Sequence, residues 1–247
     1  MERIAVVSDI HGNKTAWDAV VADIERRGIT RIFCLGDLVG KGPMPAEVVD
    51  SIRERAEIVV RGNWDELVTK VQDNINFTWQ AERLGEERLM YLLTLPFSYD
   101  FRLSGRHIRL LHASPQSVYH RVQPWDEEKL RLAMFDPIVT PKDEMEAASP
   151  DVVGYGDVHN AYLQHLDGKV LFNAGSVGNP LDLTQASYCI LEGDFDSRQT
   201  GSFNIQFVRV PYNIELEVER AAAAGVPSLD LYIRELRTGV YRGMAGE

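Results

Sequence analysis

The sequence predicts an α/β protein built around a parallel β-sheet. Within residues 1–60, three short apolar segments typical of buried strands alternate with two segments of helical periodicity. This βαβαβ alternation predicts parallel strands joined by right-handed crossovers. Each apolar segment is followed within three residues by Asp or Asn, and the carboxyl ends of parallel strands are where such sheets bind ligands.

The elements of this first unit follow from the residue pattern. Ile4–Val7 is a short apolar strand. Lys14–Arg27 has apolar residues at helical spacing and is ended by Gly28, because glycine readily adopts the left-handed conformation found after helices. Pro45 is suited to the first turn of a second helix. The remaining predicted elements are strand Arg31–Leu35, helix Pro45–Arg55 and strand Ile58–Val60.

The rest of the chain continues the mixed pattern. Residues 64–95 are polar and helical, and residues 115–150 are irregular, acidic and proline-rich, as in a cap or flap. We expect one domain, 1–247, with a helical and irregular insertion at about 64–150 and two C-terminal helices at about 213–238. The expected strands are Tyr99–Leu103, His107–His112, Asp151–Tyr155, Tyr162–Leu166, Lys169–Phe172, Tyr188–Leu191 and Phe203–Val210, and the helices are Ile214–Ala223 and Ser228–Thr238.

Composition narrows the possible partners and location. The net charge of −11 and the lack of a visible basic stripe make nucleic acid an improbable partner. No apolar run approaches the roughly 18 residues of a membrane helix, and the acidic N-terminal segment does not fit a signal peptide, so we expect a cytoplasmic protein without membrane contact. Cys34 and Cys189 lie in apolar runs and are expected to be buried thiols.

Seven side chains at predicted strand ends are candidate metal ligands. Their oxygen and nitrogen atoms suit two divalent cations such as Mn²⁺, Fe²⁺, Zn²⁺ or Mg²⁺. In the Asp-x-His pairs, residues i and i+2 would point the same way if the backbone were extended. Such ions would also supply the local positive charge that an acidic protein needs to attract a phosphate. The candidates are Asp9, His11, Asp37, Asn63, His112, Asp157 and His159.

Five short motifs occur in order at the predicted strand ends: Asp9-Ile10-His11, Gly36-Asp37, Gly62-Asn63-Trp64-Asp65, His112 and Gly156-Asp157-Val158-His159. With these motifs the chain resembles the calcineurin-like metallophosphoesterase superfamily, and within it the small bacterial and archaeal phosphodiesterase-like members. The resemblance extends from residue 4 to about 180, where Leu171–Pro180 is similar to a segment after the last family motif. It implies a four-layer α/β/β/α sandwich with two mixed sheets flanked by helices.

The resemblance also implies roles for these residues. One metal ion would be held by Asp9, His11, Asp37 and His159, and a second by Asp37, Asn63, His112 and Asp157. Asn13 and Lys41 would contact the substrate phosphate. The implied enzyme is a dinuclear phosphoesterase, with Mn²⁺ as the first choice of metal, that hydrolyses a small phosphodiester or a nucleotide phosphoanhydride by metal-bound hydroxide.

Position 64 departs from the family pattern. Trp64 stands where many members have the histidine that protonates the leaving group, and an indole donates a hydrogen bond but does not titrate. Losing a general acid typically costs ~10²–10⁴ in rate, which favours substrates with good leaving groups. No catalytic side chain is identified, and His120 is the one candidate for a replacement acid. Trp64 could pack at the edge of the site or stack on a base.

Position 157 is the second departure. Asp157 stands where a histidine usually binds the second metal, so two divalent cations with Asp9, Asp37, Asp157 and one hydroxide would be neutral rather than +1. One unit charge at ~4 Å is worth about 4 kcal/mol at an effective dielectric constant of 20. Asp157 should therefore weaken anion attraction and favour harder ions such as Mn²⁺ or Mg²⁺. Alternatively, the second metal site is weak or empty.

These departures keep two other functions open. One is a catalytically degenerate member that binds protein partners, for which a retromer subunit with this fold is the precedent. The other is a metal-dependent nucleotide sensor that binds without turnover. Six family ligands out of seven are retained, which favours the enzyme. The sequence identifies neither the physiological substrate nor the oligomeric state.

Overall fold

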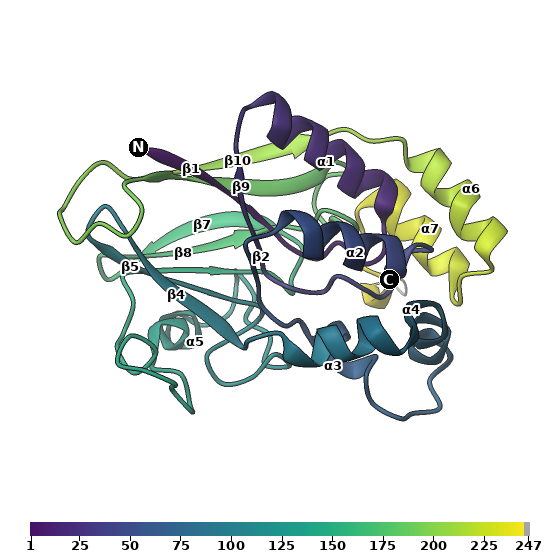
Figure 1. The fold of residues 1–247 in the computed structure, drawn as a ribbon, viewed down its shortest axis with the longest axis horizontal. Coiled ribbons are helices and arrows are strands. Elements are labelled where there is room, and N and C mark those ends of the chain that lie inside the picture. The colour runs from purple at the N-terminus through teal and green to yellow at the C-terminus, as the bar shows by residue number, and fades with distance from the viewer. Residues whose placement is uncertain (245–247) are drawn as a thin grey trace.

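The computed structural model describes residues 1–244, which form two five-stranded β-sheets flanked by helices (Figure 1). The first sheet has the order β10-β9-β1-β2-β3 and the second has the order β4-β5-β6-β8-β7. The strands of the first are β1 (Glu2–Val7), β2 (Arg31–Cys34), β3 (Ile58–Val59), β9 (Ala186–Gly193) and β10 (Asn204–Val210). Those of the second are β4 (Ser98–Leu103), β5 (Arg106–Leu111), β6 (Val152–Tyr155), β7 (Ala161–Leu166) and β8 (Lys169–Ala174).

Both sheets are mixed. In the first, β1, β2 and β3 are parallel, while β9 and β10 pair antiparallel at one side. In the second, β5, β6 and β8 are parallel, and β4 and β7 are antiparallel edge strands. The parallel strands of the first sheet confirm the βαβαβ interpretation, because their order along the chain is also their order in space.

Alternation along the strands produces the layers. In β1, Ile4 and Val6 point into the core between the sheets, where they meet side chains of the second sheet such as Leu110. Ala5 and Val7 point to the opposite face, into a second core beneath the helices. Successive side chains of a strand face opposite ways, so one strand contributes to both cores.

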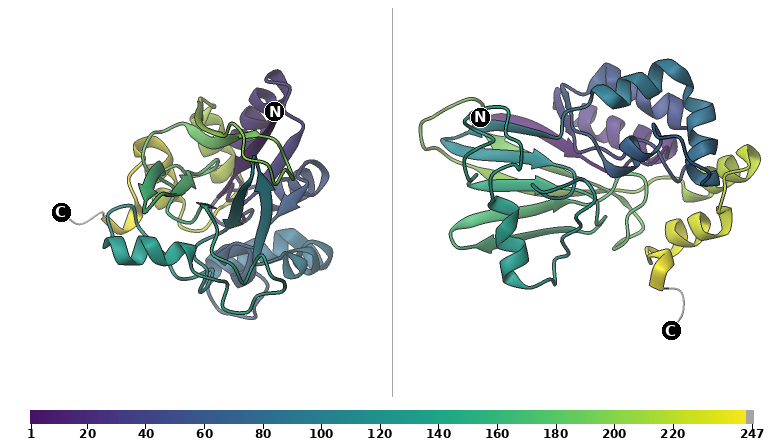
Figure 2. Two further views of the ribbon diagram at one scale, coloured as in Figure 1. Left: turned by 90° about the vertical axis from the view of Figure 1, so that its left-hand side faces the viewer. Right: turned by 90° about the horizontal axis from the view of Figure 1, so that it is seen from below.

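Helices cover the outer faces. α1 (Lys14–Arg26), α2 (Pro45–Arg55) and α4 (Ile75–Thr94) pack on the first sheet. Figure 2 shows α6 (Ile214–Ala224) and α7 (Leu229–Thr238) at the end of the molecule opposite the N-terminus. The four-layer α/β/β/α sandwich is therefore confirmed. The short helices are α3 (Asn63–Leu67), α5 (Glu128–Leu132), η1 (Ala133–Phe135) and η2 (Arg242–Met244).

Two features of the middle of the chain were not evident from the pattern. The helical segment predicted at 64–95 is split into α3 and α4, and α4 itself is interrupted at Gly85, whose φ of 71° is non-helical. Within 115–150, Met134 and Phe135 pack on the outer face of the second sheet. Both cysteines are buried. Among residues 1–244, no helix is both long and apolar enough to cross a bilayer.

Candidate metal centre and adjoining cavity

Five of the predicted ligands meet between the carboxyl ends of parallel strands from both sheets. Asp9 and His11 follow β1, Asp37 follows β2, His112 follows β5 and His159 follows β6. They form two groups that share one carboxylate: Asp9 with His11 and His159, and Asp9 with Asp37 and His112. All five side chains are buried.

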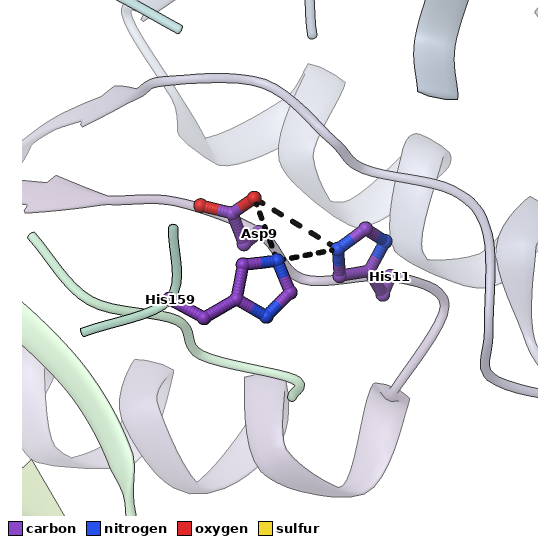
Figure 3. Close-up of side chains that lie close together, drawn as sticks. All are labelled: Asp9, His11 and His159. Carbon is purple, nitrogen blue, oxygen red and sulfur yellow. Dashed lines mark hydrogen bonds and ion pairs between the residues drawn. The ribbon is translucent and has the colours of Figure 1, made fainter. Parts of the chain in front are cut away.

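The first group brings three ligand atoms to one point (Figure 3). The Nε2 atom of His159 lies 3.2 Å from Asp9 Oδ1, and that of His11 lies 3.8 Å from the same oxygen. The two Nε2 atoms are 3.1 Å apart. A single cation between them could contact all three side chains.

Asp37 connects the two groups. Its Oδ1 lies 3.4 Å from His112 Nε2 in the second group, and its Oδ2 lies 3.6 Å from His11 Nε2 in the first. A carboxylate that presents one oxygen to each of two neighbouring ligand sets is suited to bridge two cations.

Hydrogen bonds determine which imidazole nitrogen faces the centre. The Nδ1 atoms of His11, His112 and His159 lie 3.0, 2.8 and 2.6 Å from the backbone carbonyl oxygens of Val39, Leu35 and Asn179. A carbonyl only accepts, so each Nδ1 carries the proton and each Nε2 presents a lone pair. This is the arrangement of metal-binding histidines.

The ligand set fits divalent cations. Among residues 1–244, Asp9 Oδ1 and His112 Nε2 are buried without a hydrogen-bond partner, which is costly unless another group binds there. Burial lowers the pKa of His112, but the carboxylates of Asp37, Asp9 and Asp157 outweigh burial and raise it to about 9. Burial also raises the pKa of Asp37. The negative potential that favours a proton on His112 would equally favour a metal cation.

The backbone at these ligands is left-handed and not extended. Asp9, His11, Asp37, Asp157 and His159 all have φ between 52° and 63°, a region that is uncommon for residues other than glycine. The expectation that each Asp-x-His pair is extended was therefore wrong. Such strained conformations cluster at functional sites, where surrounding contacts maintain them.

Buried polar contacts hold the ligand loops in place. Ser8 Oγ and the backbone N–H of Asp157 donate to Asp9 Oδ2, at 2.6 and 3.1 Å, which leaves Oδ1 directed at the histidines. Asp65 accepts hydrogen bonds from the backbone N–H groups of Asp37, Leu38 and Gly62 at 2.8–3.0 Å. Asp65 thus joins the loop after β2 to the start of α3.

Asp157 is paired with a cation that sequence reasoning missed. Arg121 Nε and a terminal nitrogen each donate to one oxygen of Asp157 at 2.9 Å, and Asn63 Nδ2 donates to Oδ1 at 3.0 Å. The Asp157 side chain is 2% exposed and that of Arg121 is 44% exposed. With Arg121 beside Asp157, the local charge equals that of a site with a neutral histidine at position 157. Asp157 does not belong to the two ligand groups.

Lys41 is held by the C-terminal helix. Its Nζ donates to Asn179 Oδ1 and lies 3.2 Å from Glu235 Oε2. Glu235 also accepts hydrogen bonds from Arg242 at 2.7 and 2.8 Å. Burial raises the pKa of Glu235, but Arg242 and Lys41 outweigh this effect and lower it to about 2. Burial lowers the pKa of Lys41 to about 8, although the nearby Glu235 carboxylate acts to raise it.

Two other predicted residues lie in local hydrogen-bond networks. Asn13 is fully buried, and its side chain caps α1 by accepting from Ala16 N at 2.9 Å and donates to Gly178 O at 2.8 Å. His120 Nδ1 lies 3.0 Å from Ser114 Oγ. The structure therefore brings neither side chain into the two ligand groups.

Trp64 is packed beside the centre. Its ring lies 4.6 Å from that of Phe77 between centroids, and 5.8 Å from that of His11 in an edge-on arrangement. The indole also lines the neighbouring cavity. Trp64 therefore packs against one side of the first ligand group and also forms part of the cavity wall.

A cavity of about 410 Å³ adjoins the ligand groups. Its wall contains Asp37 and His159 from the centre, and Asp157 beside it. Three cations also line it, namely Lys41, Arg121 and Arg242. Anionic ligands could therefore enter next to the proposed metal ligands without facing a purely acidic surface.

Two known proteins are similar to this chain over much of its length. The chain is 33% identical over 240 residues to the uncharacterized protein MJ0912 of Methanocaldococcus jannaschii, covering 91% of this chain and 93% of that one. It is 27% identical over 150 residues to the phosphodiesterase YfcE of Escherichia coli, covering 56% of this chain and 78% of YfcE.

Solved structures show the same fold. A metallophosphoesterase from Sphaerobacter thermophilus has a TM-score of 0.74 at 24% identity, covering 97% of this chain and 99% of that one. The hypothetical protein PH1004 from Pyrococcus horikoshii has a TM-score of 0.76 at 20% identity, covering 98% and 100%.

Residues 2–196 match the family described as the calcineurin-like phosphoesterase superfamily domain. The family implies divalent metal ions, and the two ligand groups provide sites for them. The resemblance inferred from the motifs is thereby confirmed. The chain belongs to the calcineurin-like phosphoesterase superfamily and is a metal-dependent phosphoester hydrolase.

Proposed function

We propose that the protein is a dinuclear, Mn²⁺-preferring hydrolase of a small phosphodiester or a nucleotide phosphoanhydride. The observation that carries the proposal is the pair of buried ligand groups that share Asp9 and are spanned by the two oxygens of Asp37. One cation would be held by Asp9, His11, Asp37 and His159. The second would be held by Asp37, Asn63, His112 and Asp157, with Asp9 close to both.

The chemistry follows from this arrangement. Two divalent cations would supply Lewis acidity, making a water nucleophilic near neutral pH and neutralising the phosphate oxygens. Lys41 lines the cavity beside Asp37, and its ammonium would donate to a phosphate oxygen. Asn13 caps α1, so we assign its contribution to holding the loop that carries His11.

Arg121 offers the second positive group. Its guanidinium lines the cavity while paired to Asp157. Arginine presents several N–H donors in a fixed plane, so two can bind Asp157 while others remain for a phosphate. The two hydrogen bonds to Asp157 hold the Arg121 guanidinium in place. The positive charge of Arg121 offsets the extra negative charge at position 157.

Leaving-group protonation restricts the substrate. Trp64 is not an acid, and His120 contacts Ser114 rather than the ligand groups. We therefore propose that the enzyme acts on phosphoesters or phosphoanhydrides whose leaving groups depart without a protonating side chain.

A nucleotide sensor without turnover is the second candidate. The observation that favours it is that both Asp157 oxygens are engaged by Arg121, and one also by Asn63. If these bonds persist with metal present, the second cation loses Asp157 as a ligand. Binding of one metal ion with no turnover would then be the expected behaviour.

The test combines metal content with turnover. Protein reconstituted with Mn²⁺ is analysed for bound metal and for hydrolysis of bis-p-nitrophenyl phosphate. Asp37→Ala removes the proposed bridge, and Asp73→Ala, a change at an exposed carboxylate, is the matched control. Two metal ions per chain, with turnover lost in Asp37→Ala and kept in Asp73→Ala, supports the enzyme. One metal ion and no turnover with Mn²⁺, Zn²⁺, Fe²⁺ or Mg²⁺ favours the sensor.

A further inference from the structure

The cavity beside the ligand groups is larger than a phosphate requires. Its volume of about 410 Å³ lies within the roughly 300–1,000 Å³ typical of small-molecule sites. Asp37 and His159 line the part at the proposed metal centre. Much of the remaining wall comes from residues in two distant stretches, 121–125 and 239–242. A substrate held by its phosphate would therefore have its organic group in this space.

Two aromatic side chains in this wall are exposed. Trp125 is 72% exposed and Tyr241 is 42% exposed, and both line the cavity. Trp64 differs, since it packs on Phe77. Within the described part of the chain, no ring partner is found for Trp125 or Tyr241. Exposed aromatic faces beside a phosphate site are suited to stack on a planar ring.

A polar group in the same wall lacks a partner. Gln123 lines the cavity, and its Oε1 atom is buried without a hydrogen bond to any residue in 1–244. A buried acceptor left without a donor costs free energy, so a small rotation of the Gln123 amide toward a ligand N–H in the cavity would be favoured. Nucleobases present N–H donors at their edges, whereas simple aryl and alkyl groups do not.

The cations of the wall are held in place by carboxylates. Arg121 is fixed by Asp157, and Arg242 by Glu235. Guanidinium groups bind phosphate oxygens and also stack on aromatic rings. They give this cavity local positive charge in a chain of net charge −11, which would help it attract a nucleotide.

We propose that this cavity is a nucleoside subsite, in which Trp125 and Tyr241 stack on the base and Gln123 accepts a hydrogen bond from its edge. The subsite rests on the proposed function, because the phosphate of the same molecule would sit at the metal centre. It narrows the substrate class from small phosphoesters to nucleotides.

The test compares two ligands that differ only by the base. Isothermal titration calorimetry on the Mn²⁺-loaded full chain gives the Kd of AMP and of ribose 5-phosphate. We expect AMP to bind at least about tenfold more tightly, as for one base stacked on an aromatic side chain. Trp125→Ala and Tyr241→Ala should each reduce this ratio severalfold while changing the Kd of ribose 5-phosphate less than about twofold.

Controls separate stacking from structural damage. Trp125→Phe keeps a ring and should retain most of the ratio. Tyr119→Ala removes an exposed aromatic side chain outside the cavity and should leave the ratio unchanged. Equal Kd values for the two ligands, or a ratio that survives both alanine changes, would overturn the subsite.

The subsite and the enzyme can fail independently. Hydrolysis of bis-p-nitrophenyl phosphate is measured on the same preparations. Base-dependent binding without hydrolysis would support the subsite and contradict the hydrolase proposal. Hydrolysis with no preference for AMP over ribose 5-phosphate would support the hydrolase and refute the subsite.

Discussion

The contact between Lys41 and Glu235 makes a sharp prediction about pH dependence. Glu235 is fully buried and the Lys41 side chain is 8% exposed, so solvent screens the pair weakly. Burial has already lowered the pKa of Lys41 from 10.5 to about 8. The predicted phosphate-binding cation therefore loses its proton as pH rises through about 8, and kcat/KM should fall over the same range.

The substitution Glu235→Gln keeps the shape of the side chain and removes its charge. At 3.2 Å and an effective dielectric constant of about 20, the lost attraction is about 5 kcal/mol before screening, or roughly 4 pKa units. Water entry and relaxation of Arg242 reduce this value. We expect the pKa of Lys41 to fall by at least about one unit, which lowers its protonated fraction at pH 7.5 from roughly three quarters to a quarter.

The assay is kcat/KM for bis-p-nitrophenyl phosphate from pH 6 to 9.5 with Mn²⁺. The alkaline decline should shift by at least about one unit to lower pH in Glu235→Gln, while the values at pH 6 stay within about threefold. Lys41→Arg, which does not titrate in this range, should lack the decline. An alkaline decline at the same pH in Glu235→Gln, or one that persists in Lys41→Arg, would refute the role of Lys41.

Four further predictions test the metal centre and its surroundings. Saturating Mn²⁺ at about 100 times its Kd should add about 2.7 kcal/mol to the free energy of unfolding and raise Tm by about 5–10 °C; scanning calorimetry with and without EDTA measures this, and an unchanged Tm contradicts the metal site. Arg121→Met leaves the buried Asp157 carboxylate without its cation, and because Arg121 is 44% exposed we expect a loss of only about 1–2 kcal/mol in urea unfolding. Recovery of full stability by Arg121→Lys would argue against the bidentate contact. Gly62→Ala would place a Cβ atom 2.1 Å from Asp37 Oδ1 and 2.3 Å from Asp37 N, so unfolding should become easier by more than about 2 kcal/mol, with weaker Mn²⁺ binding by calorimetry; wild-type values would show that the loop relaxes freely. Trp64→His should speed hydrolysis of alkyl phosphodiesters by up to about 10²-fold and leave p-nitrophenyl esters nearly unchanged, whereas equal effects on both would show that leaving-group protonation is not limiting.

Several features could be read from the sequence because their signals are local. The apolar segments at 31–35 and 58–60 predicted β2 and β3 to within one residue at each end. The segment at 4–7 predicted β1 apart from its first two residues. The Asp-x-His pair after the first strand and His112 after a later one belong to motifs whose order along the chain matches that of the calcineurin-like superfamily. Asn13 was interpreted as a phosphate contact, although an asparagine directly before the helix at Lys14 is also a strong cap signal, and the structure shows that cap.

The tertiary structure decided which charges face one another. Arg121 and Asp157 are 36 positions apart, and Lys41 and Glu235 are 194 apart. Nothing in the local pattern connects them, because each pair joins segments that are distant in the sequence and adjacent only in the folded chain.

The sequence by itself determined the fold class, the family and five candidate ligands that the structure brings together, because periodicity and short motifs are properties of neighbouring residues. The left-handed backbone at Asp9 and His11, the charge beside Asp157 and the aromatic cavity near the metal centre were decided by packing. Packing decides these features because electrostatic and stacking energies depend on how far apart groups lie in space, and only the folded chain sets those distances.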